Sequence, residues 1–137
     1  MNPYIRDILS QPDMLRAALD HYSKSALEKI DLKDFDRIIL SGMGSSFNAA
    51  YPAFIELSKQ SVPVQLVNAA ELLHSLYGMT GTRSLLWLNS QSGRSAELVH
   101  LLERSRSVPP VRLLTFVNDV TSPMGERTDV CIPIHAG

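Results

Sequence analysis

The spacing of hydrophobic residues changes once along the chain, near residue 37. In the first 30 or so residues, apolar positions recur at roughly helical spacing, and they are Met14, Leu15, Ala18, Tyr22, Leu27 and Ile30. Pro12 followed by Asp13 is typical of a helix start, so we place the beginning of a helix there. From residue 37 onward, short apolar runs alternate with longer amphipathic ones, and this rhythm predicts alternating strands and helices.

Five apolar runs are the predicted strands, at 37–44, 63–68, 84–90, 111–118 and 129–135. Between them lie three helix candidates, at 46–60, 69–78 and 95–105, and a short turn at 122–128. The runs are almost continuously apolar, as expected of strands that helices cover on both faces, so the sheet should be mostly parallel. We therefore expect a three-layer, doubly wound α/β fold preceded by N-terminal helices. Right-handed crossovers favour the flavodoxin-like strand order 2-1-3-4-5.

Two loops of this layout are rich in glycine and serine. Residues 41–46 follow the first strand and residues 90–95 follow the third, so both should lie beside the switch in strand order, where such sheets bind ligands. Besides Ser41 and Arg94, the polar residues of these loops are Ser45, Ser46, Ser90, Gln91, Ser92 and Ser95. Hydroxyls, free backbone N–H groups and two helix starts predict an anion site of little formal charge, suited to a polyhydroxylated ligand. For either loop alone, an ordinary capped turn is the alternative.

Other phosphate-binding folds fit these residues poorly. Phe47 stands where a dinucleotide fingerprint has its third glycine, and Asn68 stands where that fold has a ribose-binding acid. No Gly-Lys-Ser or Gly-Lys-Thr follows the first loop, so it is not a Walker A loop. A phospho-receiver domain would need an aspartate at the end of the third strand, where Asn89 and Ser90 stand.

Composition narrows the class further. The chain has 137 residues, 45% hydrophobic and 20% charged, which is enough for one soluble domain with an ordinary core. A net charge of −1 argues against nucleic acid as a partner. The single Cys131 fits a reducing compartment, and the absence of a long apolar run argues against a membrane partner, so we expect a cytoplasmic protein. His21, His100 and His135 lack metal-ligand spacing, and we predict no metal.

Residues 90–97, Ser-Gln-Ser-Gly-Arg-Ser-Ala-Glu, resemble the signature of the sugar isomerase (SIS) family of phosphosugar-binding domains. Residues 42–50 look like the first phosphosugar loop of that family. The likeness covers about residues 37–135, so we divide the chain into an N-terminal helical segment, 1–36, and a SIS domain, 37–137. The resemblance implies that a sugar phosphate is held by Ser46, Ser90, Gln91, Ser92 and Ser95, and the predicted set is completed by Gly44, Ser45 and Gly93.

Different stretches resemble different branches of the family. Residues 11–19 look like the start of the isomerase half of glucosamine-6-phosphate synthase and of fructosamine deglycases, which carry two SIS domains in tandem. Residues 69–79 and 121–125 look more like arabinose-5-phosphate isomerase, which carries one. Ser45 stands where that isomerase has a lysine. The chain is accordingly interpreted either as a single SIS domain or as the first half of a tandem protein.

The resemblance implies an aldose–ketose isomerase, or a deglycase or deaminase of amino-sugar phosphates, working without a redox cofactor. Glu56, Glu71 and His74 are candidate bases, although a solvated acid, a capping acid and an exposed histidine account for them as well. In both branches, part of the catalytic apparatus lies beyond the position that corresponds to Gly137 of this chain. A non-catalytic sensor of sugar phosphates is the alternative function. Because SIS sites are commonly completed by a neighbouring domain, we expect a homodimer or higher homo-oligomer.

Overall fold

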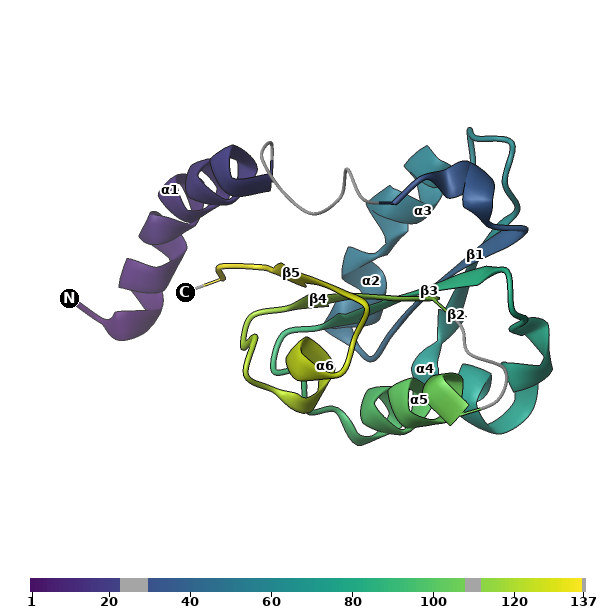
Figure 1. Cartoon of the computed structure of the whole chain (residues 1–137). Helices are drawn as coiled ribbons and strands as arrows, with labels where there is room; N and C mark the ends of the chain where they lie inside the picture. The colour runs from purple at the N-terminus through teal and green to yellow at the C-terminus, as the bar shows by residue number, and fades with distance from the viewer. Residues whose placement is uncertain (23–29, 108–111, 137) are drawn as a thin grey trace.

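A five-stranded parallel sheet is the centre of the fold (Figure 1). The computed structural model describes residues 1–22, 30–107 and 112–136. The strands are β1 (Arg37–Gly42), β2 (Val64–Asn68), β3 (Ser84–Ser90), β4 (Arg112–Val117) and β5 (Val130–Pro133). They pair in parallel in the order β2-β1-β3-β4-β5. The predicted fold class and strand order are confirmed.

Helices cover both faces of the sheet (Figure 1). On one face lie α4 (Ala69–Glu71), α5 (Ala96–Ser107) and α6 (Pro123–Glu126), and on the other lie α2 (Ser45–Ala49) and α3 (Tyr51–Leu57). Successive strand residues serve opposite faces, so Ile39 and Leu86 pack towards α5, whereas Ile38, Leu40 and Leu85 pack towards α2 and α3. This double burial explains why the strands are almost continuously apolar.

The register of the strands aligns their carboxyl ends. Gly42 at the end of β1 lies opposite Asn68 of β2 and Asn89 of β3, and Ser90 lies opposite Val117 of β4. The segments that follow β1, β3 and β4 therefore begin at one common edge of the sheet. This edge lies at the switch in strand order, where β2 and β3 flank β1.

Two predicted helices are less regular than their hydrophobic spacing suggests. The segment 46–60 is divided into α2 and α3 at Ala50, where Pro52 in the first turn of α3 supplies no backbone N–H. In place of the predicted helix at 69–78 lie α4, a π-helical turn η3 (Leu72–Leu76) and a 3₁₀ turn η4 (Tyr77–Met79). The turn at 122–128 contains the short helix α6, which Ser122 caps. A further 3₁₀ turn, η2 (Leu32–Asp34), precedes β1.

The helix α1 (Pro3–Tyr22) corrects one prediction, because it begins at Pro3 and continues through Pro12. A proline inside a helix removes one backbone donor, and here the affected turn is exposed, so water can satisfy the free carbonyl. Ala18 is the buried residue of α1, and the hydroxyl of Tyr22 donates a hydrogen bond to the carbonyl of Pro133 at 2.7 Å. Leu27 lies outside the described residues.

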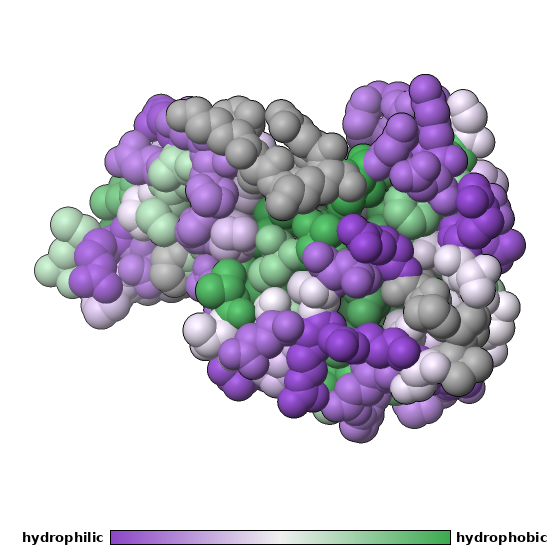
Figure 2. All heavy atoms as spheres, in the orientation of Figure 1, coloured by the Kyte–Doolittle hydropathy of each residue, from purple (hydrophilic) through white to green (hydrophobic). Residues whose placement is uncertain are grey.

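Most of the apolar surface of α1 is uncovered. Its exposed large side chains are Tyr4, Ile5, Ile8, Leu9, Leu15 and Leu19. Figure 1 shows the helix standing beside β5, away from the sheet faces that α2 to α6 cover. In Figure 2 the same end of the molecule carries hydrophobic and hydrophilic residues side by side. Among the described residues, no helix is both long and apolar enough to span a bilayer.

Candidate functional site

The first serine loop joins β1 to α2. Gly44 caps α2 with φ of +53°, a conformation that glycine adopts without steric cost. Ser45 is exposed and Ser46 is half-buried at the start of the helix. Ser41 is turned away, since its buried hydroxyl donates to the carbonyl of Val67 at 2.8 Å. The loop therefore presents the hydroxyls at 45 and 46, as predicted, while Ser41 ties β1 to β2.

The second serine loop joins β3 to α5. Ser90 is buried, and its Oγ accepts a hydrogen bond from the N–H of Gly93 at 3.0 Å and lies 3.4 Å from the Oγ of Ser95. Ser92 is exposed, and its Oγ accepts from the N–H of Arg94 at 3.2 Å. Gln91 is also exposed. The side chains of Ser90 and Ser92 thus shape the loop, and those of Gln91 and Ser92 face solvent.

The segment after β4 supports the second loop. The N–H of Asn118 donates to the carbonyl of Gln91 at 3.0 Å, and the N–H of Met124 donates to that of Gly93 at 3.4 Å. Gly93 has φ of +66°, and a Cβ there would overlap the side chain of Ser122. The loop is therefore held in shape by a segment about 30 residues further along the chain.

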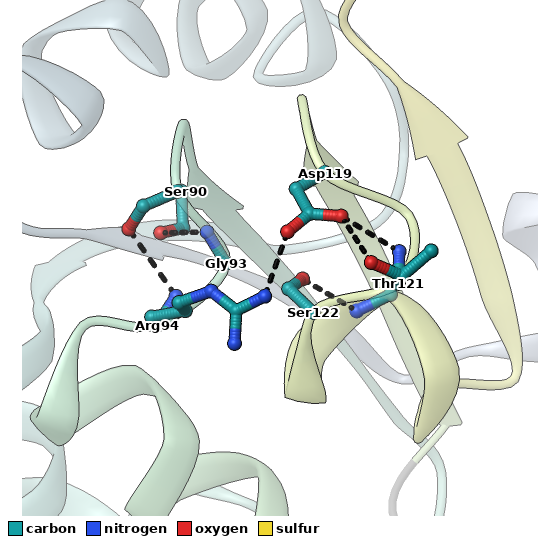
Figure 3. Close-up of polar contacts among 8 residues, drawn as sticks. Ser90, Gly93, Arg94, Asp119, Thr121 and Ser122 are labelled. Atoms are coloured by element: carbon teal, nitrogen blue, oxygen red, sulfur yellow. Dashed lines mark hydrogen bonds and ion pairs between the residues drawn. The ribbon is translucent and has the colours of Figure 1, made fainter.

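An ion pair links the same two segments at the surface (Figure 3). Nη2 of Arg94 lies 2.8 Å from Oδ2 of Asp119, and Oδ1 of Asp119 accepts from the N–H and the hydroxyl of Thr121 at 2.9 and 2.6 Å. The hydrogen bond from the hydroxyl of Thr121 lowers the pKa of the Asp119 carboxyl most, followed by those from Arg94 and from the N–H of Thr121. Sequence reasoning did not find Asp119, Thr121 or Ser122, because nothing in their local spacing connects them with residue 94.

A cavity of about 430 Å³ opens where the two serine loops meet. Four predicted residues line it, namely Ser45, Ser46, Ser90 and Gln91. The other described residues of its wall are Tyr22, Ala49, Ala53, Trp87, Asn89, Phe116 and Ile134. The remaining predicted residues, Gly44, Ser92, Gly93 and Ser95, belong to the same loops but are not part of that described wall.

The described wall of the cavity combines polar residues with aromatic and aliphatic ones. Trp87 and Phe116 stack with ring centroids 4.7 Å apart and planes 12° apart, and the indole N–H of Trp87 donates to Oδ1 of Asn89 at 2.8 Å. The described lining residues include no lysine, arginine, aspartate or glutamate. Chemically, the site offers neutral donors to an anion and an apolar surface to its carbon skeleton.

A second hollow, of about 580 Å³, lies between α1 and residues 134–136. Its described lining contains none of the predicted ligand residues. Because the serine loops line the smaller cavity, that cavity is the candidate site.

The three candidate bases lie outside the described wall of the cavity. Glu56 is exposed on α3, and its Oε2 lies 2.6 Å from the ammonium of Lys59. Glu71 on α4 and His74 on η3 are also exposed. The structure therefore brings four of the predicted binding residues to one cavity, whereas none of these three candidate bases is part of its described wall, and their catalytic roles stay predictions.

Two further observations concern metal ligands and the single thiol in the described part of the chain. No three of its His, Cys, Asp and Glu side chains gather where they could hold a metal ion. Cys131 is half-buried on β5, and burial raises the pKa of its thiol, against a smaller opposing effect of a hydrogen bond with Thr115.

Comparison with known sequences agrees with the resemblance to SIS domains. The profile of the SIS domain matches residues 31–137. The glutamine–fructose-6-phosphate aminotransferase (isomerizing) of Pyrococcus horikoshii is 31% identical over 135 residues, covering 97% of this chain and 22% of that protein. The arabinose 5-phosphate isomerase KpsF of Escherichia coli is 28% identical over 98 residues, covering 72% of this chain and 31% of that protein. The chain thus spans a fifth to a third of these relatives.

Solved structures share the fold. The C-terminal domain of glucosamine-fructose-6-phosphate aminotransferase from Francisella tularensis matches with a TM-score of 0.82 and 22% identity, covering 98% of this chain and 40% of that one. The E. coli CFT073 protein c3406, solved as a complex with a ligand, matches with a TM-score of 0.75 and 21% identity, covering 98% of this chain and 75% of that one. At this level of identity the likeness establishes the fold.

Proposed function

Since this chain belongs to the SIS domain family, we propose that it binds a phosphosugar where its two serine loops meet. The observation that carries the proposal is the convergence of Ser45, Ser46, Ser90 and Gln91 on one cavity whose described lining carries no charged side chain. Neutral hydroxyls and amides suit both a phosphate and the hydroxyls of a sugar. The names of the two sequence relatives refer to fructose 6-phosphate and arabinose 5-phosphate, and they support this ligand class.

The reaction that we propose is aldose–ketose isomerisation, or deglycation or deamination of an amino-sugar phosphate. Isomerisation needs a base that takes the proton from C2 of the opened aldose and returns it to C1, while the C1 carbonyl becomes a hydroxyl and the C2 hydroxyl a carbonyl. Glu56, Glu71 and His74 stay the candidates for this base in the chain. Such a transfer needs no redox cofactor, because no net electrons leave the sugar.

A non-catalytic sugar-phosphate sensor is the second candidate function. The observation that favours it is the exposed position of all three candidate bases, outside the described cavity wall. The two functions differ in a simple measurement. An isomerase in deuterated water incorporates deuterium at C1 or C2 of the bound sugar phosphate, whereas a sensor binds the same ligand without exchange.

We also propose that the chain self-associates. The exposed apolar positions of α1, among them Leu9 and Leu15, support this, because large exposed apolar patches are uncommon on soluble monomers. The cytoplasmic location expected from the composition stays a prediction.

Thermal stabilisation tests the binding site. Fructose 6-phosphate or glucosamine 6-phosphate at 100 times its Kd should stabilise the chain by about 2.7 kcal/mol, which a thermal melt detects. The double variant Ser46→Ala with Ser92→Ala should lose this effect, because it removes one hydroxyl from each loop. Ser75→Ala, an exposed serine on η3, is the matched control and should keep it. No stabilisation by any sugar phosphate would refute the proposal.

A further inference from the structure

Arg94 is the cation of the second serine loop, and it is not among the described residues that line the cavity. It lies between Gly93 and Ser95, next to the hydroxyls that the loop presents, and its side chain is 57% exposed. A guanidinium beside a phosphate site ordinarily strengthens binding through charge-assisted hydrogen bonds. In this structure, however, the guanidinium is occupied by Asp119, at 2.8 Å between Nη2 and Oδ2.

Asp119 is itself fixed in the position that receives Arg94. Thr121 donates two hydrogen bonds, from its backbone N–H and its hydroxyl, to the same oxygen Oδ1, which leaves Oδ2 directed at the guanidinium (Figure 3). The carboxylate therefore does not have to be ordered by Arg94, because the turn at 119–121 already orders it. This arrangement favours a persistent pair over a chance encounter of two long surface side chains.

We propose that Asp119 withholds the charge of Arg94 from the ligand and thereby sets the affinity of the site for phosphosugars. The inference rests on the proposed function, since it assumes that a sugar phosphate binds at the serine loops. The wild-type site then binds phosphate mainly through neutral hydroxyls and N–H groups, and its affinity depends weakly on salt. Removing the negative charge at 119 releases Arg94 to the phosphate.

The shape of the loop does not depend on this pair alone. Backbone bonds from Asn118 to Gln91 and from Met124 to Gly93 connect the same segments, and the Oγ of Ser90 accepts from the N–H of Gly93 inside the loop. Asp119→Asn also keeps an oxygen that can accept from Thr121. The substitution should therefore alter charge while leaving the loop in place.

Isothermal titration of the full chain with fructose 6-phosphate tests the proposal. Asp119→Asn should bind about three- to tenfold tighter than wild type at low salt, and this gain should shrink at about 0.5 M salt. Arg94→Gln should bind within about twofold of wild type, because its charge is already neutralised. In the double variant Asp119→Asn with Arg94→Gln the gain should disappear. Asp119→Ser, measured in parallel, should show the same gain in affinity. It keeps the test valid if Asp119→Asn is poorly folded.

Three results would overturn the inference. Unchanged or weaker binding by both Asp119→Asn and Asp119→Ser would show that Asp119 does not restrain Arg94. A gain that survives Arg94→Gln would show that the freed guanidinium is not its source. An equal gain for unphosphorylated fructose would show that the phosphate is not what Arg94 reaches. If wild type itself binds no sugar phosphate, the proposed function fails instead, so the two failures are distinguishable.

Discussion

At the scale of single residues, Gly93 connects the backbone of the second loop to the segment that supports it. Its φ of +66° strains any other residue, and a Cβ would overlap Ser122. We expect Gly93→Ala to lower the free energy of unfolding by roughly 1–3 kcal/mol, since both effects must be relieved. Urea unfolding followed by circular dichroism measures the loss.

Gly44→Ala is the matched control for that substitution. Gly44 has φ of +53°, but nothing lies within 4 Å of a Cβ built there. The backbone strain alone should cost about 1 kcal/mol. Equal losses in the two variants would contradict a specific role for the contact with Ser122.

The thiol of Cys131 illustrates how burial controls a titration. Burial raises its pKa above the ordinary value, so the folded chain keeps the thiol neutral over a pH range in which the unfolded chain ionises it. Its contribution to stability is complete below the unfolded pKa and falls as the pH rises through the folded pKa. Because the thiolate is the reactive form, iodoacetamide at about pH 8.5 should modify Cys131 more slowly in buffer than in urea. Equal rates would contradict this.

At the scale of elements, the strands were easier to predict than the helices. Runs such as 84–90 are apolar on both faces, and between turn-rich segments this pattern is typical of a buried strand. Helical spacing, in contrast, does not show where a helix is interrupted, as at Ala50 before Pro52 or in the π-helical turn of η3. The predicted start of α1 was wrong because Pro12 is tolerated inside an exposed helix.

Two leucines of different exposure test which elements contribute to the stability of the fold. Leu86 on β3 is 0% exposed, whereas Leu15 on α1 is 65% exposed. We expect Leu86→Ala to lower the free energy of unfolding by about 2–5 kcal/mol, the usual loss for a buried leucine. Leu15→Ala should change it by about 0.5 kcal/mol or less, as an exposed site does. Urea unfolding of both variants checks this, and similar losses would show that α1 is part of the cooperative core.

At the scale of the whole molecule, the position of the site was predictable and its support was not. Parallel strands place the loops after β1 and β3 together, so Ser46 and Ser90 could be expected in one cavity from topology alone. The residues that support the second loop could not be predicted. Arg94 and Asp119 are 25 residues apart, and their pairing depends on how the turn after β4 folds back.

Self-association is the prediction that belongs to this scale. If α1 mediates it, the double variant Leu9→Glu with Leu15→Glu should sediment as a smaller species than wild type, because two charges per copy would be placed in an apolar contact. Val120→Glu is the matched control, since Val120 is 48% exposed but lies on the turn after β4. An unchanged mass in the double variant would exclude α1 as the contact.

The uncharged wall of the cavity has a consequence for acidity. Tyr22 is the one acid–base side chain among its described lining residues, and burial raises the pKa of that phenol above its usual value near 10. The described wall therefore has no side chain that titrates near neutral pH, whereas a phosphate monoester loses its second proton with a pKa of about 6. Any change in affinity between about pH 5 and pH 7 should consequently follow the ionisation of the sugar phosphate and shift with the acidity of the ligand.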